Sequence, residues 1–241
     1  METTETKELK TAFFATFSQG LFATLIFSTF MVNTPILFEL IEMTKTEFSI
    51  GFVFFGIFNV ITNQLTTRFL LPKIGSTNCL IIARVMYSFI PFYIFYFSNY
   101  NIFILVSIFW GISIGIQAPN IFTQVAIIEE RTKKILNPIF KSSFNFGFLS
   151  GAAISSICLG FDIDPIYTTF FIGLFVFISS LSMYFFGLEK KYDVVNDNPR
   201  FAVPNFNIIL FASINMFIIA FMGIIVQWLS LIHISEPTRP Y

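Results

Sequence analysis

The sequence predicts an all-α membrane protein with six spanning helices and the start of a seventh, and three observations support this fold class. First, 55% of the 241 residues are hydrophobic, only 12% are charged, and the mean hydropathy is +0.77. A soluble core of this length could not hide so much apolar surface, so the surrounding solvent must be lipid. Second, the apolar residues gather in long runs, and third, the charged residues are segregated between those runs.

The first run carries no charge from Thr11 to Phe38, which exceeds the roughly 20 residues that cross about 30 Å of hydrocarbon. We expect a tilted spanning helix rather than a cleaved signal peptide, because the run is too long and has no small-x-small cleavage site. Backbone groups in lipid must bond within their own segment, so every later run should also be a helix. These runs cover about 48–71, 79–97, 102–128, 140–161 and 166–188, and a seventh starts near residue 206.

The basic residues predict the orientation. With a cytoplasmic N-terminus, every inside segment is basic and the outside segments hold only Lys45, which satisfies the positive-inside rule. The acidic residues of the outside loops are Glu39, Glu42, Glu47, Asp162 and Asp164. The inside segments hold Lys7, Lys10, Arg68, Lys73, Arg131, Lys133, Lys134, Lys141, Lys190, Lys191 and Arg200.

The chain divides into four parts. Residues 1–188 form a six-helix half, 189–205 form a polar cytoplasmic linker, and 206–228 form a seventh helix. The last part, 229–241, resembles a translated sequencing adapter from Leu229 to Arg239. It contains the only histidine, His233, which we therefore exclude from any site. We expect the chain to be a truncated form of a protein of about twice its length.

The turn between the second and third runs carries a recognisable motif. The segment Pro72–Ser76 reads PKIGS, with Lys73 and Gly75 in the places of a basic residue and a glycine of a G-x-x-x-D-R-x-G-R type motif. With the six helices and the polar linker, this turn resembles the major facilitator superfamily of secondary transporters. The resemblance implies two six-helix halves, each built from two three-helix inverted repeats. It also implies a gating loop at Arg68, Lys73 and Gly75, although topology alone would place the same cations there, and Pro72 replaces the motif's Asp.

A second resemblance covers Gly111–Arg131 and Phe140–Ala152. These stretches are similar to a bacterial inner-membrane subgroup that includes sugar symporter-like proteins. That resemblance implies a multi-pass protein of the bacterial cytoplasmic (inner) membrane. Two small-xxx-small pairs within the stretches predict close helix packing, at Gly111 with Gly115 and at Gly147 with Gly151.

The candidate substrate-binding residues are amides inside the spans. Ser113, Gln117, Asn120 and Gln124 recur at helical spacing, and this polar stripe should face the bundle interior or a wet cavity. Interhelical hydrogen bonding would explain the same stripe without any substrate. The full set of candidates is Gln19, Asn33, Gln117, Asn120, Gln124 and Asn145.

Arg84 is the only charged residue placed well within a span. We expect its side chain to snorkel toward the cytoplasmic face, the alternatives being attraction of an anionic substrate or of a partner on the second helix. The spans contain no Asp or Glu, so a coupling ion, H⁺ or Na⁺, would depend on residues elsewhere, with Glu129 and Glu130 at the rim as the nearest acids.

The sequence offers no catalytic constellation, metal-ligand set, nucleotide loop or nucleic-acid motif, so we expect no enzyme activity and no cofactor. The amide stripe favours a secondary transporter of a small, polar, neutral solute. The more specific prediction is a sugar-like solute. A drug-efflux pump differs from it only in direction. The alternative of a different class is a membrane scaffold that binds a partner without moving solute, which the missing motif Asp and the absence of buried acids would favour.

Overall fold

The computed structural model describes residues 4–193, 205–206, 209–210, 213–214 and 217. The chain forms two units, Met1–Asn196 and Asp197–Tyr241, and the helices below belong to the first. Most of the predicted seventh helix and most of the predicted linker fall outside the described residues, and the tail 229–241 lies wholly outside them.

The described part of the first unit is all-helical. Six segments are long and apolar enough to cross a membrane, as the apolar runs predict. The second segment is α2 continued through a π-helical stretch into α3, and the third is α4 with α5. The helices are α1 (Thr4–Ile41), α2 (Lys45–Leu65), α3 (Leu71–Ile74), α4 (Ser76–Ser88), α5 (Ile90–Phe97), α6 (Tyr100–Thr132), α7 (Asn137–Gly160) and α8 (Pro165–Phe186).

Three helices begin at side-chain caps that follow from the local sequence. Thr44 and Glu47 form a capping box at the start of α2, in which each side chain bonds the other's backbone amide. Asn99 accepts a hydrogen bond of 2.9 Å from the amide of Asn101 at the start of α6, and Asp164 accepts one of 2.8 Å from that of Ile166 at the start of α8. These caps satisfy amides that would otherwise lack partners at the helix ends.

The third span is broken where the sequence predicts an unbroken run. The chain leaves helical geometry at Phe89, between α4 and α5, and Pro91 follows at the first turn of α5. Proline has no amide hydrogen and its ring clashes with the carbonyl four residues earlier, so a continuous helix is strained here. The segment still counts as one span of 22 residues, Ser76–Phe97.

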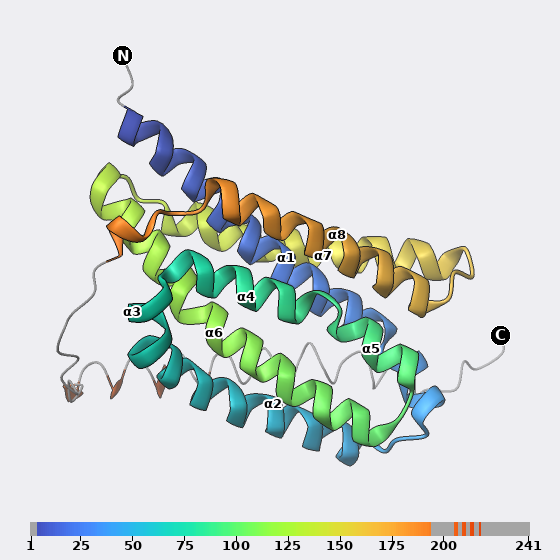
Figure 1. The fold of residues 1–241 in the computed structure, drawn as a ribbon. Coiled ribbons are helices and arrows are strands. Elements are labelled where there is room, and N and C mark those ends of the chain that lie inside the picture. The colour runs from blue at the N-terminus through green and yellow to red at the C-terminus, as the bar shows by residue number, and fades with distance from the viewer. Residues whose placement is uncertain (1–3, 194–204, 207–208, 211–212, 215–216, 218–241) are drawn as a thin grey trace. The chain divides into compact units, whose positions relative to one another are not determined.

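Helices α1 and α6 contact each other and most of the other helices of the bundle (Figure 1). The most extensive contacts join α1 to α7 and α2 to α6, and further contacts join α4 to α6, α1 to α8 and α4 to α8. Glycines allow the two closest pairs. A Cβ on Gly115 would lie 2.6 Å from the carbonyl oxygen of Asn59, and one on Gly151 would collide with the backbone of Leu25. The predicted close packing at both glycine pairs is therefore confirmed.

Aromatic residues fill the larger hydrophobic cluster. The ring of Phe30 meets Trp110 edge-on at a centroid distance of 5.2 Å, and Phe48 stacks on Phe103 at 5.7 Å. Such pairs add to the stabilisation from buried area alone. A second cluster, which includes Leu80, lies where α1, α4, α6 and α8 meet.

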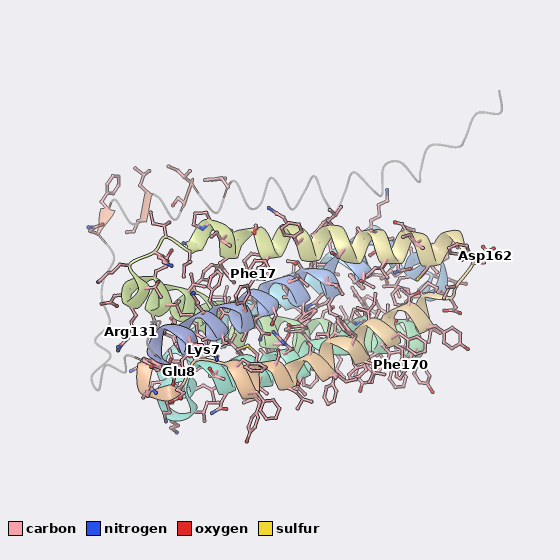
Figure 2. The ribbon with its side chains drawn as sticks, turned by 90° about the horizontal axis from the view of Figure 1, so that it is seen from above. Lys7, Glu8, Phe17, Arg131, Asp162 and Phe170 are labelled. Carbon is pink, nitrogen blue, oxygen red and sulfur yellow. The ribbon has the colours of Figure 1, made fainter. Side chains whose placement is uncertain are left out.

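The two ends of the bundle differ in charge. Lys7, Glu8 and Arg131 lie at one end in Figure 2, and Asp162 lies at the opposite end. The turn between α3 and α4 lies at the first end (Figure 1), and the acidic residues of the predicted outside loops belong to the α7–α8 loop and to the connection between α1 and α2 with the adjoining helix ends. Which end faces the cytoplasm stays a prediction from the basic residues.

Candidate functional site

A pocket opens where α1, α2, α6 and α7 meet. Its volume is about 280 Å³. All four helices contribute to its lining, and the wall includes Thr24, Phe27, Phe55, Trp110, Gln117 and Phe144. The pocket lies beside both glycine-packed helix pairs, so the close packing of those pairs fixes its walls.

The walls of this pocket are mostly apolar, with aromatic and aliphatic side chains, and carry no charged side chain. Trp110 lies edge-on to Phe27 and Phe55, with centroid distances of 5.8 and 6.0 Å. The polar groups are few: Thr24, whose hydroxyl donates to the carbonyl of Gly20 at 3.1 Å, and Gln117. Mostly apolar walls with a few placed polar groups are typical of small-molecule sites, and the absence of charge in the lining suits an uncharged ligand.

The polar stripe of α6 faces the interior, as predicted. Ser113, Asn120 and Gln124 are fully buried and Gln117 is 4% exposed. Only Gln117 also lines the pocket. Burial alone does not distinguish a substrate contact from an interhelical hydrogen bond, and substrate binding by these residues stays a prediction.

Gln117 connects the pocket to a deeper polar network. Its amide nitrogen donates to the backbone carbonyl of Gln19 on α1 at 3.2 Å. The side chain of Gln19 is fully buried, donates to the carbonyl of Leu80 at 2.6 Å, and accepts a hydrogen bond from Arg84. Two predicted residues, Gln19 and Gln117, therefore meet between α1 and α6, and α4 supplies their third neighbour.

Arg84 does not snorkel. Its side chain is fully buried between α1, α4 and α8, and its Nη1 donates to the carbonyl of Ser179 at 2.9 Å while its Nη2 donates to the hydroxyl of Ser18 at 2.9 Å. The guanidinium also lies 5.2 Å from the ring centroid of Phe22. The expectation was wrong because these oxygens and the ring lie nearby and replace water, so the side chain gains nothing by reaching the membrane surface.

No carboxylate accepts from Arg84 among the described residues. A buried charge held by neutral groups is unusual, because its desolvation is offset only by hydrogen bonds. The sequence did show that Arg84 is unusual, because it places a charge eight residues into the span that begins at Ser76. Its burial was not, because the acceptors on α8 are about a hundred residues away in the chain.

Asn33 and Asn120 are buried and bond mainly within their own helices. The amide nitrogen of Asn33 donates to the carbonyl of Thr29 at 2.7 Å, and that of Asn120 donates to the carbonyl of Ile116 at 2.6 Å. The Oδ1 atom of each has no hydrogen-bond donor in the described structure. Each therefore offers a buried acceptor that a water or a ligand could satisfy.

Gln124 belongs to a different region, at the basic end of the bundle. Its oxygen accepts a hydrogen bond of 2.7 Å from Thr16, and its nitrogen donates to the hydroxyls of Ser76 at 3.0 Å and Thr77 at 2.8 Å. These bonds join α1, α4 and α6. The side chain has both amide atoms bonded by the protein itself, which is the arrangement of a structural group.

Asn145 lies apart from the other candidates, on an exposed face of α7. The candidate gating loop is also exposed at Arg68 and Lys73, whereas Gly75 is buried. Gly75 has φ of +84°, which favours glycine, so the expected tight turn is confirmed. The guanidinium of Arg68 lies 5.4 Å from the ring centroid of Phe69.

The start of the linker folds back on this turn, which the sequence did not predict. Asp193 accepts hydrogen bonds from the amide of Ser76 at 2.9 Å and from its hydroxyl at 2.7 Å, and so caps the N-terminus of α4. Lys190 donates to the carbonyl of Lys73 at 2.7 Å. A side chain on Gly75 would meet Asp193 at 2.9 Å, so the glycine also makes room for the cap.

Glu129 also caps the start of a helix. Its carboxylate accepts hydrogen bonds from the amides of Leu136 at 2.6 Å and Asn137 at 2.7 Å, where α7 begins. Glu129 therefore caps the N-terminus of α7. Of the two rim acids considered for ion coupling, Glu129 is thus engaged in a cap, and Glu130 is exposed.

Comparisons with protein-family models, curated proteins and solved structures find no match for this chain. The six candidate spans define the class as a multi-pass membrane protein. A more specific assignment depends on the packing of the bundle and on the pocket.

Proposed function

We propose that residues 1–188 form the N-terminal half of a secondary transporter of the major facilitator type, which moves a small, polar, neutral solute across the bacterial cytoplasmic membrane by alternating access. The observation that carries the proposal is the pairing of the helices in the bundle. The linker 189–205 would lead to a second half, of which 206–228 would be the first helix.

The pairing fits two three-helix repeats. One repeat would hold α1, α2 and α4 with α5, and the other α6, α7 and α8. If the repeats are exchanged, α1 corresponds to α6, α2 to α7, and α4 with α5 to α8. The contact of α1 with α7 then corresponds to that of α6 with α2, and the contact of α4 with α6 corresponds to that of α8 with α1. The contact of α4 and α5 with α8 maps onto itself. A bundle without internal repetition has no reason to obey this exchange, which supports a repeat architecture.

The pocket supports a solute site in this half. It lies among α1, α2, α6 and α7, which the exchange of repeats maps onto one another, and transporter sites lie at interfaces between repeats. The uncharged lining with Gln117 and Thr24 favours a neutral solute with hydrogen-bonding groups. The buried acceptors of Asn33 and Asn120 are further candidates for contact during the transport cycle.

The gating role of Arg68, Lys73 and Gly75 belongs to the same proposal. In the described unit the turn is tied to Lys190 and Asp193, so a movement of the linker would act directly on it. A coupling ion, H⁺ or Na⁺, would depend on acids outside the six spans.

The test is transport by the full gene product expressed in a host cell, with uptake and efflux followed over a panel of neutral solutes. Gln117→Ala should reduce transport at least about tenfold while leaving membrane abundance unchanged, because one hydrogen bond in the membrane is worth only about 0.6 kcal/mol to the fold. Gln64→Ala, an amide change on the exposed face of α2, is the matched control and should transport normally. Equal transport by both variants would remove Gln117 from the site, and absence of transport for every solute would favour the scaffold.

A further inference from the structure

A second pocket lies at the basic end of the bundle, away from the solute pocket. It has a volume of about 540 Å³ and is bounded by the first turns of α1, the last turn of α6 and the connection to α7. This is the end at which Figure 2 labels Lys7, Glu8 and Arg131. The pocket lies where the charged N-terminal segment gives way to the uncharged run that starts at Thr11, which is where the sequence predicts the boundary between the headgroups and the hydrocarbon.

The floor of this pocket is apolar. Leu9, Phe13 and Ile128 line it with exposures of 3%, 9% and 0%, so their side chains are already packed and form a fixed surface. Phe14 also lines the pocket and is 69% exposed. An apolar floor open at the membrane boundary suits a hydrocarbon chain better than a water-soluble ion.

The rim of the pocket is basic. Lys10, Arg131 and Lys134 line it, and no acidic side chain does. The guanidinium of Arg131 lies 4.9 Å from the ring centroid of Tyr192, which orients it at the rim. Lys134 also lines a neighbouring pocket of about 740 Å³, where Lys133 and Lys141 are accompanied by Glu129 and Glu130, so the exclusively basic lining is a feature of the first pocket.

The combination selects the ligand. The positive-inside rule accounts for cations at this end, but it does not account for a pocket that places three of them around an apolar floor. A soluble anion would make no apolar contact with the floor, and a neutral lipid would form no ion pair with the rim. A ligand with a negative headgroup and a hydrocarbon chain uses both, and basic pockets between spanning helices are suited to anionic headgroups.

We propose that this pocket binds an anionic glycerophospholipid of the leaflet in which it lies. The phosphate is held among Lys10, Arg131 and Lys134, and the upper part of one acyl chain lies on Leu9 and Phe13, with Phe14 covering the chain at the mouth. The site is independent of the solute pocket and of the transport proposal. A bound lipid would join α1 to the end of α6 at the side of the bundle where the linker is tied down.

The test uses the whole chain, purified in neutral detergent, and native mass spectrometry to measure the binding of phosphatidylglycerol and of phosphatidylcholine with the same acyl chains. The site variant is Lys10→Gln/Arg131→Gln/Lys134→Gln. The matched control, Lys7→Gln/Arg68→Gln/Lys73→Gln, removes the same charge from the same end, at three exposed residues outside the pocket. The site variant should lose phosphatidylglycerol affinity about 10- to 100-fold, the control less than about threefold, and phosphatidylcholine binding should not change.

Two further arms separate the sources of the anion and protect against a folding artefact. Inorganic phosphate at millimolar concentration should not displace the lipid, and Phe14→Ser, which alters an exposed side chain, should weaken binding of the long-chain lipid more than that of a short-chain one. Equal losses in the site and control variants would overturn the proposal in favour of general surface charge. Displacement by phosphate, or no effect of Phe14→Ser, would overturn the assignment of a lipid.

Discussion

The contact between α2 and α6 gives the sharpest stability prediction. A Cβ at Gly115 would lie 2.6 Å from the carbonyl oxygen of Asn59, 2.8 Å from the Cβ of Thr62 and 3.1 Å from the amide nitrogen of Asn63. The first distance is 0.8 Å short of 3.4 Å, where ordinary van der Waals contact begins. Two of the three atoms are backbone, so relief requires α2 to move as a whole, and overpacking of this kind costs about 1–3 kcal/mol.

Gly115→Ala should therefore lower the free energy of unfolding by about 1–3 kcal/mol. The matched control is Gly56→Ala on the facing helix α2, where an added Cβ meets nothing within 4 Å. Alanine is the better helix former by up to about 1 kcal/mol, so the control should be neutral or stabilising. Unfolding of both variants in mixed micelles with increasing sodium dodecyl sulfate, followed by Trp fluorescence, measures the difference. Equal stability of the two variants would refute the close helix approach on which the pocket walls depend.

The remaining predictions concern the buried cation and the linker. Arg84→Lys should lower the thermal unfolding midpoint, with a cost of about 1–3 kcal/mol, because one ammonium cannot reach the acceptors on both α1 and α8. Arg84→Met should stay within about 1 kcal/mol of the parent, since it removes the desolvated charge itself, and a large loss would show that the charge is essential to the fold. Asp193→Ala should cost about 0.5–2 kcal/mol in the same assay and speed proteolysis after Tyr192, because the cap of α4 is lost. Glu39→Ala, which removes an exposed acid of α1, serves as its control, and identical behaviour of the two would contradict the cap.

The features that the sequence predicted are those with a local signal. Six spans follow from run length alone, and the glycine pairs follow from a four-residue spacing that places both members on one helix face. The inward direction of the α6 stripe follows from the cost of exposing amides to lipid, whatever the fold.

The features that it did not predict depend on distant residues. Arg84 is buried because acceptors on α1 and α8 meet it, and Asp193 caps a helix that starts 117 residues earlier. The role of Gln124 likewise depends on Thr16 and Ser76, which the linear pattern of α6 does not contain. Hydropathy and spacing report on one helix at a time, so they identify polar residues that avoid lipid without identifying their partners.

The candidate site shows the same division. Gln117 was selected by its position on the stripe, and the structure places it at a pocket, whereas the aromatic walls at Phe27, Phe55 and Trp110 carried no signal distinct from ordinary core packing. In a chain with 36 phenylalanines, composition does not separate a wall from a core. The wall is distinguished from the core only by the three-dimensional arrangement in which α1, α2, α6 and α7 meet.

The most direct test of the central claim, that residues 1–188 are one half of a two-half transporter, is to read the gene past the codon for Trp228. The locus should be amplified from native DNA with a primer upstream of that codon and sequenced without transposon adapters. The frame should continue into five further apolar spans, which would complete a second six-helix half. A frame that stops directly after Tyr241 would contradict the claim.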